Sequence, residues 1–309
     1  MTQQNSPILS IPENEVLSEA SQTAGCNGSV KELLDSMQRL GDGNYSERIR
    51  PDAEGNMINP ELDKAFNEMA DKLEKRNNDK NDFLSGVAHD LRSPMTSIIG
   101  FIDGILDGAI EKNDEEKYLN IVRDECMRLS GLVTELLDIS RMQAGDRKFV
   151  MKAFDICEKA RTILIGFEQR IEEKKLDVEF SCDSHNMSAY GDSDAIHRVL
   201  YNICDNAVKF SRPGGKYRIE IGYTDATESR IKVSVFNQGD GIPEKDLAHV
   251  FERFYRSDKT VTASVRGTGL GLYIAKLIID AHGGEIFAES VAGEWCKISF
   301  VIPAAEAGT

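Results

Sequence analysis

The sequence predicts an α+β multidomain protein, in which a helical hairpin is followed by an α/β sandwich built on one mixed sheet. Two observations lead to this prediction. Apolar residues step by 4 and 3 from Leu84 to Ile105 without a break, the spacing of a helix packed in a left-handed bundle. After residue 146, helical stretches alternate with runs rich in β-branched residues, as expected for a sheet covered by helices.

Composition narrows the class of protein. The 309 residues carry a formal net charge of −15, so nucleic acid and anionic membrane are not expected partners. Six scattered cysteines without a C-x-x-C pair argue against a zinc cluster and a disulfide framework, and indicate reduced thiols. Because no apolar run approaches the ~18 residues of a membrane span, we expect a cytoplasmic protein, or the cytoplasmic part of a membrane sensor whose helices lie upstream.

The N-terminal part predicts a short relay of helices. Residues 1–28 are rich in polar side chains and are expected to be a mobile leader. Apolar residues at helical spacing follow up to Leu40, and a Gly-Asp-Gly turn and a polar connector lead to Pro60. From Leu62 to Leu73 a second apolar seam begins. Residues 29–76 resemble a HAMP signal-relay module, although many short amphipathic helices share this pattern.

The next segment predicts a helical hairpin. One helix is expected over 81–108, and a second begins at Asn113 with acidic residues in its first turn. The second helix carries two adjacent apolar rows, which is a wider face than one partner helix covers. Two such hairpins packed as a four-helix bundle would cover it, so we expect a homodimer.

A histidine within this hairpin is the candidate nucleophile. His89 follows the seam residue Ala88, so it should lie beside the bundle core and stay accessible. A hydrogen bond from Nδ1–H to the neighbouring Asp90 would leave the Nε2 lone pair outward, as attack on phosphorus requires. Pro94 removes one helical hydrogen bond and predicts a bend, unless it merely ends a helix.

The run from His89 to Pro94 resembles the phosphoacceptor box of sensor histidine kinases. The resemblance implies that His89 is phosphorylated, that Asp90 orients or deprotonates its ring, and that Arg92 lies near the incoming phosphate. It also implies transfer of the phosphoryl group to an aspartate of a response-regulator receiver domain. Ser93 stands where members that dephosphorylate their partner often have Thr or Asn, which leaves phosphatase activity open.

A candidate nucleotide pocket begins with two amides and an ammonium. Asn202, Asn206 and Lys209 share one face of a predicted helix over 193–210, where they could meet a triphosphate and Mg²⁺. By itself such a face is usually solvated, so the pattern gains weight only from the motifs that follow it along the chain.

Two glycine-rich turns complete the pocket. Gly239 and Gly241 end a strand, and a Gly-x-Gly-x-Gly run ending at Gly271 leads into a helix whose free amides suit phosphate. Between the turns lies an aromatic segment followed by a polar stretch, which we interpret as a hinge and a mobile lid. The candidate residues of the two turns and the hinge are Gly239, Gly241, Phe251, Phe254, Gly267, Gly269 and Gly271.

The order of these motifs resembles the ATP-binding domain shared by histidine kinases, DNA gyrase and heat-shock chaperones. The resemblance implies that Asn206 ligates Mg²⁺, that Asn202 supports the metal or phosphates, and that Lys209 contacts phosphate. The family commonly has an aspartate, which accepts the adenine amino proton, where this chain has Asn237. ATP-hydrolysing relatives have a glutamate that activates water at the position where this chain has Asn202. Because an amide cannot act as a general base, ATP should stay intact until His89 attacks.

The sequence therefore divides into a leader (1–28), a HAMP-like relay (29–76), a dimerisation and phosphotransfer hairpin (77–146), an ATP-binding domain (150–303) and a tail (304–309). The expected function is that of an ATP-dependent, homodimeric protein-histidine kinase with ATP and Mg²⁺ as cofactors. The alternatives are a catalytically weak nucleotide-binding scaffold, or a net phosphatase of the regulator.

Overall fold

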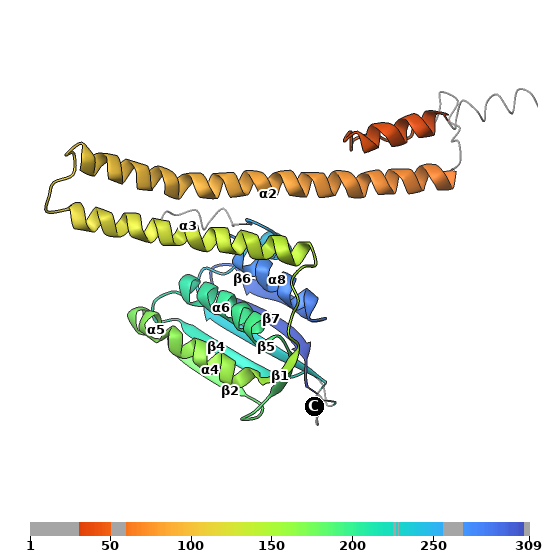
Figure 1. The fold of residues 1–309 in the computed structure, drawn as a ribbon. Coiled ribbons are helices and arrows are strands. Elements are labelled where there is room, and N and C mark those ends of the chain that lie inside the picture. Colours follow the sequence, from red (N-terminus) through yellow and green to blue (C-terminus); the bar gives the residue numbers. More distant parts are fainter. Residues whose placement is uncertain (1–30, 51–59, 225–226, 228, 256–267, 306–309) are drawn as a thin grey trace, which may run out of the picture. The chain divides into compact units, whose positions relative to one another are not determined.

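The computed structural model describes residues 31–50, 60–224, 227, 229–255 and 268–305 (Figure 1). The chain divides into two compact units, Met1–Val87 and Ala88–Thr309. The predicted leader, the predicted lid and Gly267 lie outside the described residues, as does most of the predicted tail. Ala304 and Ala305, the first residues of the predicted tail, donate backbone hydrogen bonds to Ser229 and Ser188.

The first unit contains a helix over residues 31–41 and the N-terminal part of α2 (Pro60–Leu106). Its small core consists of side chains from both helices and one from the connector between them: Leu33, Leu40, Ile49, Phe66 and Ala70. The two helices predicted from the apolar seams of this region are confirmed.

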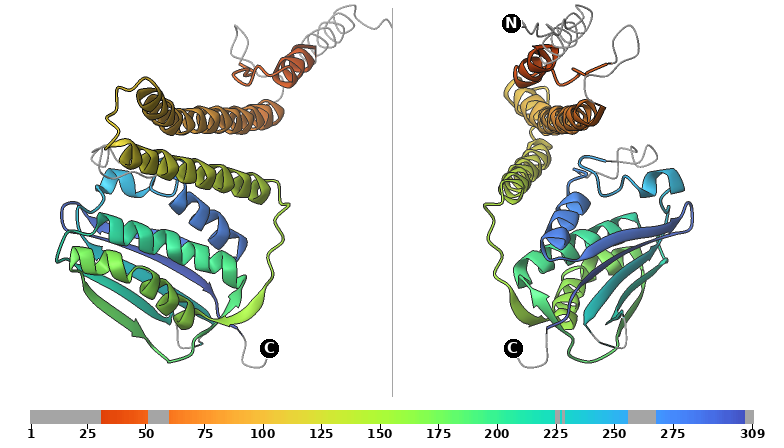
Figure 2. Two further views of the ribbon diagram at one scale, coloured as in Figure 1. Left: turned by 60° about the vertical axis from the view of Figure 1, so that its left-hand side comes forward. Right: turned by 90° about the vertical axis from the view of Figure 1, so that its right-hand side faces the viewer.

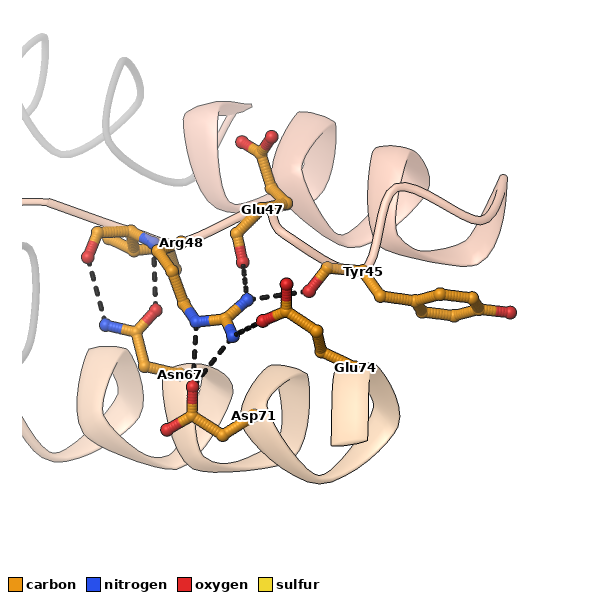
Figure 3. Close-up of polar contacts among 7 residues, drawn as sticks. Tyr45, Glu47, Arg48, Asn67, Asp71 and Glu74 are labelled. Atoms are coloured by element: carbon orange, nitrogen blue, oxygen red, sulfur yellow. Dashed lines mark hydrogen bonds and ion pairs between the residues drawn. The ribbon is translucent and has the colours of Figure 1, made fainter. Parts of the chain in front are cut away.

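A polar cluster that the sequence did not reveal holds the connector of this unit against α2 (Figure 3). The Asn67 side chain accepts a 2.9 Å hydrogen bond from Ile49 N and donates a 3.0 Å bond to Ile49 O, replacing both backbone partners of that residue. Beside it, the Arg48 guanidinium pairs with Asp71 at 2.7 Å and with Glu74 at 2.5 Å. We call Arg48, Ile49, Asn67, Asp71 and Glu74 the connector clasp.

The long helix α2 differs from the prediction in its length. The sequence predicted separate helices from Pro60 and from residue 81, but α2 is one helix of 47 residues that contains Pro94. The second helix, α3, spans Glu115–Gln143 as expected. Because the helix continues beyond it, Pro94 does not end α2, and the bend expected there stays a prediction.

The hairpin leaves apolar side chains uncovered. At its turn Gly108 has a φ of 70°, and the rings of Phe101 and Tyr118 lie 5.2 Å apart. Large hydrophobic side chains that are at least 39% exposed lie along both helices of the hairpin: Met95, Ile99, Ile102, Leu106, Leu119, Met127, Val133 and Leu137. The helical hairpin is confirmed, and these apolar side chains lie uncovered in the single chain.

The C-terminal part is an α/β sandwich on a five-stranded mixed sheet. In sheet order its strands are β2 (Asp177–Cys182), β4 (Lys216–Tyr223), β5 (Arg230–Gln238), β7 (Trp295–Pro303) and β6 (Glu285–Val291). Only β2 and β4 run parallel; the other neighbours are antiparallel. A further two-stranded sheet pairs β1 (Lys152–Asp155) with β3 (Ser188–Gly191) and was not predicted, since strands of four residues carry little periodic signal.

Helices cover one face of the sheet, where α4, α6 and α8 lie side by side (Figure 2). The helices of this part are α4 (Ile156–Gly166), α5 (Glu168–Lys174), α6 (Ser193–Phe210), α7 (Glu244–Leu247) and α8 (Gly271–Ala281). The helices α4 and α5 are separated by Phe167 alone, where the chain departs from helical geometry and the side chain enters the core. Asp155 and Asp192 cap α4 and α6 by accepting backbone N–H bonds.

Among the described residues, no helix is both long enough and apolar enough to cross a bilayer.

Candidate functional site

His89 presents its ring to solvent on α2. The side chain is 80% exposed, and its Nδ1 lies 3.2 Å from Oδ1 of Asp90, which is itself only 16% exposed. A carboxylate only accepts, so this contact assigns the proton to Nδ1 and leaves the lone pair on Nε2. The predicted contact between His89 and Asp90 is therefore present in the structure, on a ring that is largely exposed.

The next residues of the motif are exposed on the same helix. Arg92 and Ser93 both lie at the surface of α2. Their carbonyl groups accept hydrogen bonds from the hydroxyls of Thr96, at 2.9 Å, and Ser97, at 3.3 Å. These side-chain bonds flank Pro94, where the helical ladder loses a donor. Ser93 follows His89 by four residues, which is about one helical turn.

A cavity of about 470 Å³ lies between α6, β5, the two glycine turns and α3. This volume falls within the usual range for a small-molecule site, about 300–1,000 Å³. The structure brings seven of the predicted binding residues together on its walls: Asn202, Asn206, Lys209, Asn237, Gly241, Gly269 and Gly271. They come from segments up to about 70 residues apart in the chain, which supports the reading of these motifs as one pocket.

The amide face of α6 forms one wall of the cavity. Asn202, Asn206 and Lys209 all line it, as the helical spacing predicted. The Asn202 Nδ2 donates a 2.9 Å hydrogen bond to the carbonyl of Gly271, the first residue of α8. This bond ties α6 to α8 and leaves the amide oxygen as the group of Asn202 available for a metal or a water. The amide oxygens of Asn202 and Asn206 suit Mg²⁺, which takes oxygen ligands and retains waters.

The two glycine turns are held by close backbone contacts. A Cβ on Gly241 would lie 2.1 Å from Val291 O, and one on Gly269 would lie 2.8 Å from the Cα of Phe254. Both glycines also have φ values near +60° and +68° that disfavour other residues. Gly239 does not line the cavity; it packs behind the wall, where a Cβ would lie 2.0 Å from Phe210 O.

The opposite end of the cavity is built on the sheet. Asn237 on β5 is only 4% exposed and lines the cavity together with Cys296 and Ile298 of β7. Its Nδ2 is fully enclosed and has no hydrogen-bond partner among the described residues. The structure thus places the predicted base-binding residue at a buried and largely apolar end of the pocket.

The two aromatic residues of the predicted hinge are not on the walls of the cavity. Phe251 and Phe254 pack against the hydrophobic core, and Tyr255 lines the cavity instead. Phe254 has a φ of 57°, a strained backbone conformation for a bulky residue, at the point where the chain meets Gly269. The hinge residues thus support the wall rather than forming it.

The cavity also has a wall from α3, which sequence reasoning missed. Arg128 and Glu135 line it, although both come from the phosphotransfer hairpin. Thr268 Oγ1 donates a 3.2 Å hydrogen bond to Glu135 Oε2, and burial raises the pKa of Glu135 above its ordinary value. No local signal in the sequence identifies these two residues, because their place depends on how α3 packs on the α/β domain.

Two further contacts fix α3 on this domain. Asp138 forms an ion pair with Arg198 of α6, and both side chains are about three-quarters buried. Near the end of α3, Gln143 Nε2 donates a 2.9 Å hydrogen bond to the hydroxyl of Tyr273 on α8. Together with the bond between Thr268 and Glu135, these contacts hold α3 along α6, α8 and the second glycine turn (Figure 1).

Comparison with known proteins agrees with both parts of the site. The family described as His Kinase A (phospho-acceptor) domain matches residues 79–145. The family described as Histidine kinase-, DNA gyrase B-, and HSP90-like ATPase matches residues 191–306. The chain is similar to Sensor histidine kinase WalK of Bacillus subtilis, with 36% identity over 233 residues that make up 74% of this chain and 38% of the relative. It is 35% identical over 228 residues to Sensor protein SrrB of Staphylococcus aureus, with the same shares.

Solved structures share the fold. The Acinetobacter baumannii histidine kinase AdeS matches with a TM-score of 0.58 and 26% identity, covering 70% of this chain and 97% of that one. The histidine kinase ThkA, in complex with the response regulator protein TrrA, matches with a TM-score of 0.61 and 28% identity, covering 75% and 64%. The fold joins a helical hairpin that carries an exposed histidine to a domain of the histidine kinase-type ATPase family. The chain belongs to the sensor histidine kinases of two-component systems, and it spans about two fifths of the curated relatives it matches.

Proposed function

We propose that this protein is an ATP-dependent protein-histidine kinase that phosphorylates itself on His89. The observation that carries the proposal is the His89 ring itself, which is 80% exposed and has Nδ1 engaged by Asp90 at 3.2 Å. A neutral imidazole held in this way presents Nε2 as a nucleophile. The cavity of about 470 Å³ on the adjoining domain supplies the site for the phosphoryl donor.

The residues of the cavity fit the recognition of Mg·ATP. Asn206 and the oxygen of Asn202 would hold Mg²⁺, which neutralises charge on the phosphates when bound. Lys209 would contact the phosphates, and Asn237 would meet the base at the buried end. Position 202 is an amide, so no general base for water stands where hydrolysing relatives carry a glutamate. This supports transfer to His89 rather than hydrolysis.

The transfer is a displacement at phosphorus. Nε2 of His89 forms a bond to the γ-phosphorus, the bond from that phosphorus to the bridging oxygen breaks, and ADP leaves with the electron pair. The hydrogen bond to Asp90 stabilises the positive charge that develops on the ring. Arg92, exposed on the same helix, is placed to meet the charge of the incoming phosphate. Positioning and electrostatics supply most of the catalysis in such reactions.

Two partners follow from the same surfaces. The exposed apolar side chains of α2 and α3, such as Met95, Ile102 and Leu137, support a homodimer through a four-helix bundle. The phosphoryl group would pass to an aspartate of a response-regulator receiver domain, and the similarity to ThkA, which was solved with the response regulator TrrA, supports this acceptor. Residues 29–76 would act as a HAMP-like signal relay ahead of the hairpin.

Ser93 supports a second activity, a phosphatase that acts on the regulator. Its exposed hydroxyl lies about one helical turn from His89 and could place a water. Decay of the purified phospho-regulator, measured with wild-type protein and with Ser93→Ala, tests this activity. An equal rate of decay with and without the protein would exclude it.

Labelling from ATP tests the kinase proposal. The wild-type chain should acquire an acid-labile, base-stable label from ATP carrying a labelled γ-phosphate, and His89→Gln should abolish that label. His185→Gln removes another exposed imidazole and is the matched control, which should label like the wild type. Full labelling of His89→Gln would show that this residue is not the acceptor.

A further inference from the structure

The base end of the cavity contains a hydrogen-bond donor that the fold does not use. Asn237 is 96% buried, since only 4% of its surface is exposed, and its Nδ2 is enclosed without a partner among the described residues. A Cβ on Gly239 would lie 3.3 Å from this nitrogen, which locates the amide at the first glycine turn. A buried donor without a partner lowers the stability of the folded state, because the group has lost its hydrogen bonds to water. Binding of a ligand that accepts a hydrogen bond from this amide is therefore favoured.

The groups beside Asn237 carry no charge. In the sheet register Asn237 lies opposite Tyr217 on β4 and Cys296 on β7. Burial raises the pKa of Tyr217, and it raises the pKa of Cys296 to about 12, so both side chains are neutral near pH 7. The charged residue of the adjoining turn, Asp240, is exposed to solvent. The amide of Asn237 therefore sets the polarity of this end of the cavity.

An amide differs from the aspartate that is common at this position in one chemical respect. It has an acceptor and a donor, and rotation by 180° about the Cβ–Cγ bond exchanges them with little change of shape. In one orientation the amide accepts a hydrogen bond from the 6-amino group of adenine and can donate one to ring N1. In the other orientation it donates a hydrogen bond to the 6-oxo group of hypoxanthine or guanine and can accept one from N1–H. A carboxylate offers only acceptors and repels a 6-oxo group.

We propose that Asn237 makes the base subsite accept 6-oxopurine nucleotides as well as adenine nucleotides. The inference rests on the nucleotide binding proposed above and concerns the base that the same cavity selects. It assigns to Asn237 the role of a specificity-determining residue. Restoring a carboxylate should restrict the site to adenine, because a site with buried polar groups rejects an analogue that cannot pair with them.

The test compares two nucleotides that differ only at the 6-position. Calorimetric titration of the full chain with Mg·ADP and Mg·IDP avoids phosphoryl transfer and the additional 2-amino group of guanine. For the wild type we expect dissociation constants within about tenfold of each other. Asn237→Asp should raise the ratio of the IDP constant to the ADP constant by at least about tenfold, because the lost bond to the 6-oxo group becomes a repulsion.

A control variant separates base reading from general charge effects. Asp240→Asn changes a carboxylate that also lines the cavity but is exposed, and it should leave the ratio within about twofold of the wild type. The proposal is overturned if the wild type binds ADP but not IDP, if Asn237→Asp leaves the ratio unchanged, or if Asp240→Asn shifts it as much. If neither nucleotide binds, the proposed nucleotide site fails together with this inference, whereas ADP binding with an unchanged ratio refutes only the inference.

Discussion

The hydroxyl of Thr268 donates a 3.2 Å hydrogen bond to Oε2 of Glu135, joining the second glycine turn to helix α3. This contact links the two parts of the protein that the proposed reaction uses. Glu135 belongs to the phosphotransfer hairpin, and Thr268 directly precedes Gly269 on the cavity wall. If the ATP-binding domain moves to deliver a phosphoryl group to His89, this bond must break.

The stability of that contact should depend on pH. Burial raises the pKa of Glu135 above its ordinary value of 4.5, and the bond from Thr268 and the charge of Arg198 offset this only in part. The folded state therefore favours the protonated carboxyl. Its stabilising contribution is fully present below the ordinary pKa and is lost as pH rises through the raised one. We expect α3 to pack most firmly at acidic pH.

Substitution by glutamine isolates this effect. Glu135→Gln is neutral at every pH and should match the wild type in melting temperature near about pH 4, then exceed it by a growing margin up to about pH 7. Asp124→Asn, which alters a carboxylate that is 71% exposed on the same helix, should show no such growth. A margin that shrinks with rising pH would contradict the assignment.

The ion pair between Asp138 and Arg198 should stabilise the same interface. Their side chains are 25% and 24% exposed, so each charge has lost much of its hydration and depends on the other. A double-mutant cycle with alanine, measured by urea unfolding of the α/β domain, should give a coupling energy of about 0.5–3 kcal/mol. The exposed pair Lys276 and Asp280 on α8 is the control and should give less than about 0.5 kcal/mol. Equal coupling in the two pairs would refute the special role of the interface pair.

The connector clasp should protect the backbone of Ile49. Asn67 bonds to both the N–H and the C=O of that residue, at 2.9 and 3.0 Å. Asn67→Ala removes both bonds and leaves two half-buried backbone groups without partners. Hydrogen exchange at the Ile49 amide should accelerate by about 5-fold to 150-fold, the equivalent of 1–3 kcal/mol. Asn120→Ala, which removes an exposed bond on α3, should leave this amide unchanged; equal acceleration in both variants would count against a local clasp.

Much of the fold could be predicted from local patterns. The five long strands alternate with helices after residue 146, as the runs rich in β-branched residues predicted, and α6 has the predicted bounds 193–210. The exceptions have physical causes. The strands β1 and β3 have four residues each, too few for a period, and α2 continues through Pro94 because its apolar seam continues on both sides.

The candidate site also contains residues that the sequence could predict and residues that it could not. Asn202, Asn206 and Lys209 could be found because helical spacing alone brings them to one face. Arg128 and Glu135 could not, because they reach the cavity only through the packing of a helix about 70 residues earlier in the chain. The sequence could not predict that Nδ2 of Asn237 lacks a hydrogen-bond partner among the described residues, because this depends on which groups surround it in the folded protein.

The first glycine turn should tolerate no side chain at position 241. There a Cβ would lie 2.1 Å from Val291 O, and the backbone φ is +60°, so Gly241→Ala must displace the cavity wall. We expect the affinity for Mg·ADP to fall by at least about tenfold, because displacements of about 1 Å disrupt binding geometry. Gly283→Ala is the matched control, since it has a similar φ of +64° but open space around its Cβ. It should cost about 1–2 kcal/mol of stability through backbone strain and leave the affinity unchanged. Equal losses of affinity in the two variants would mean that strain, rather than the close contact at Val291, accounts for the effect of Gly241→Ala.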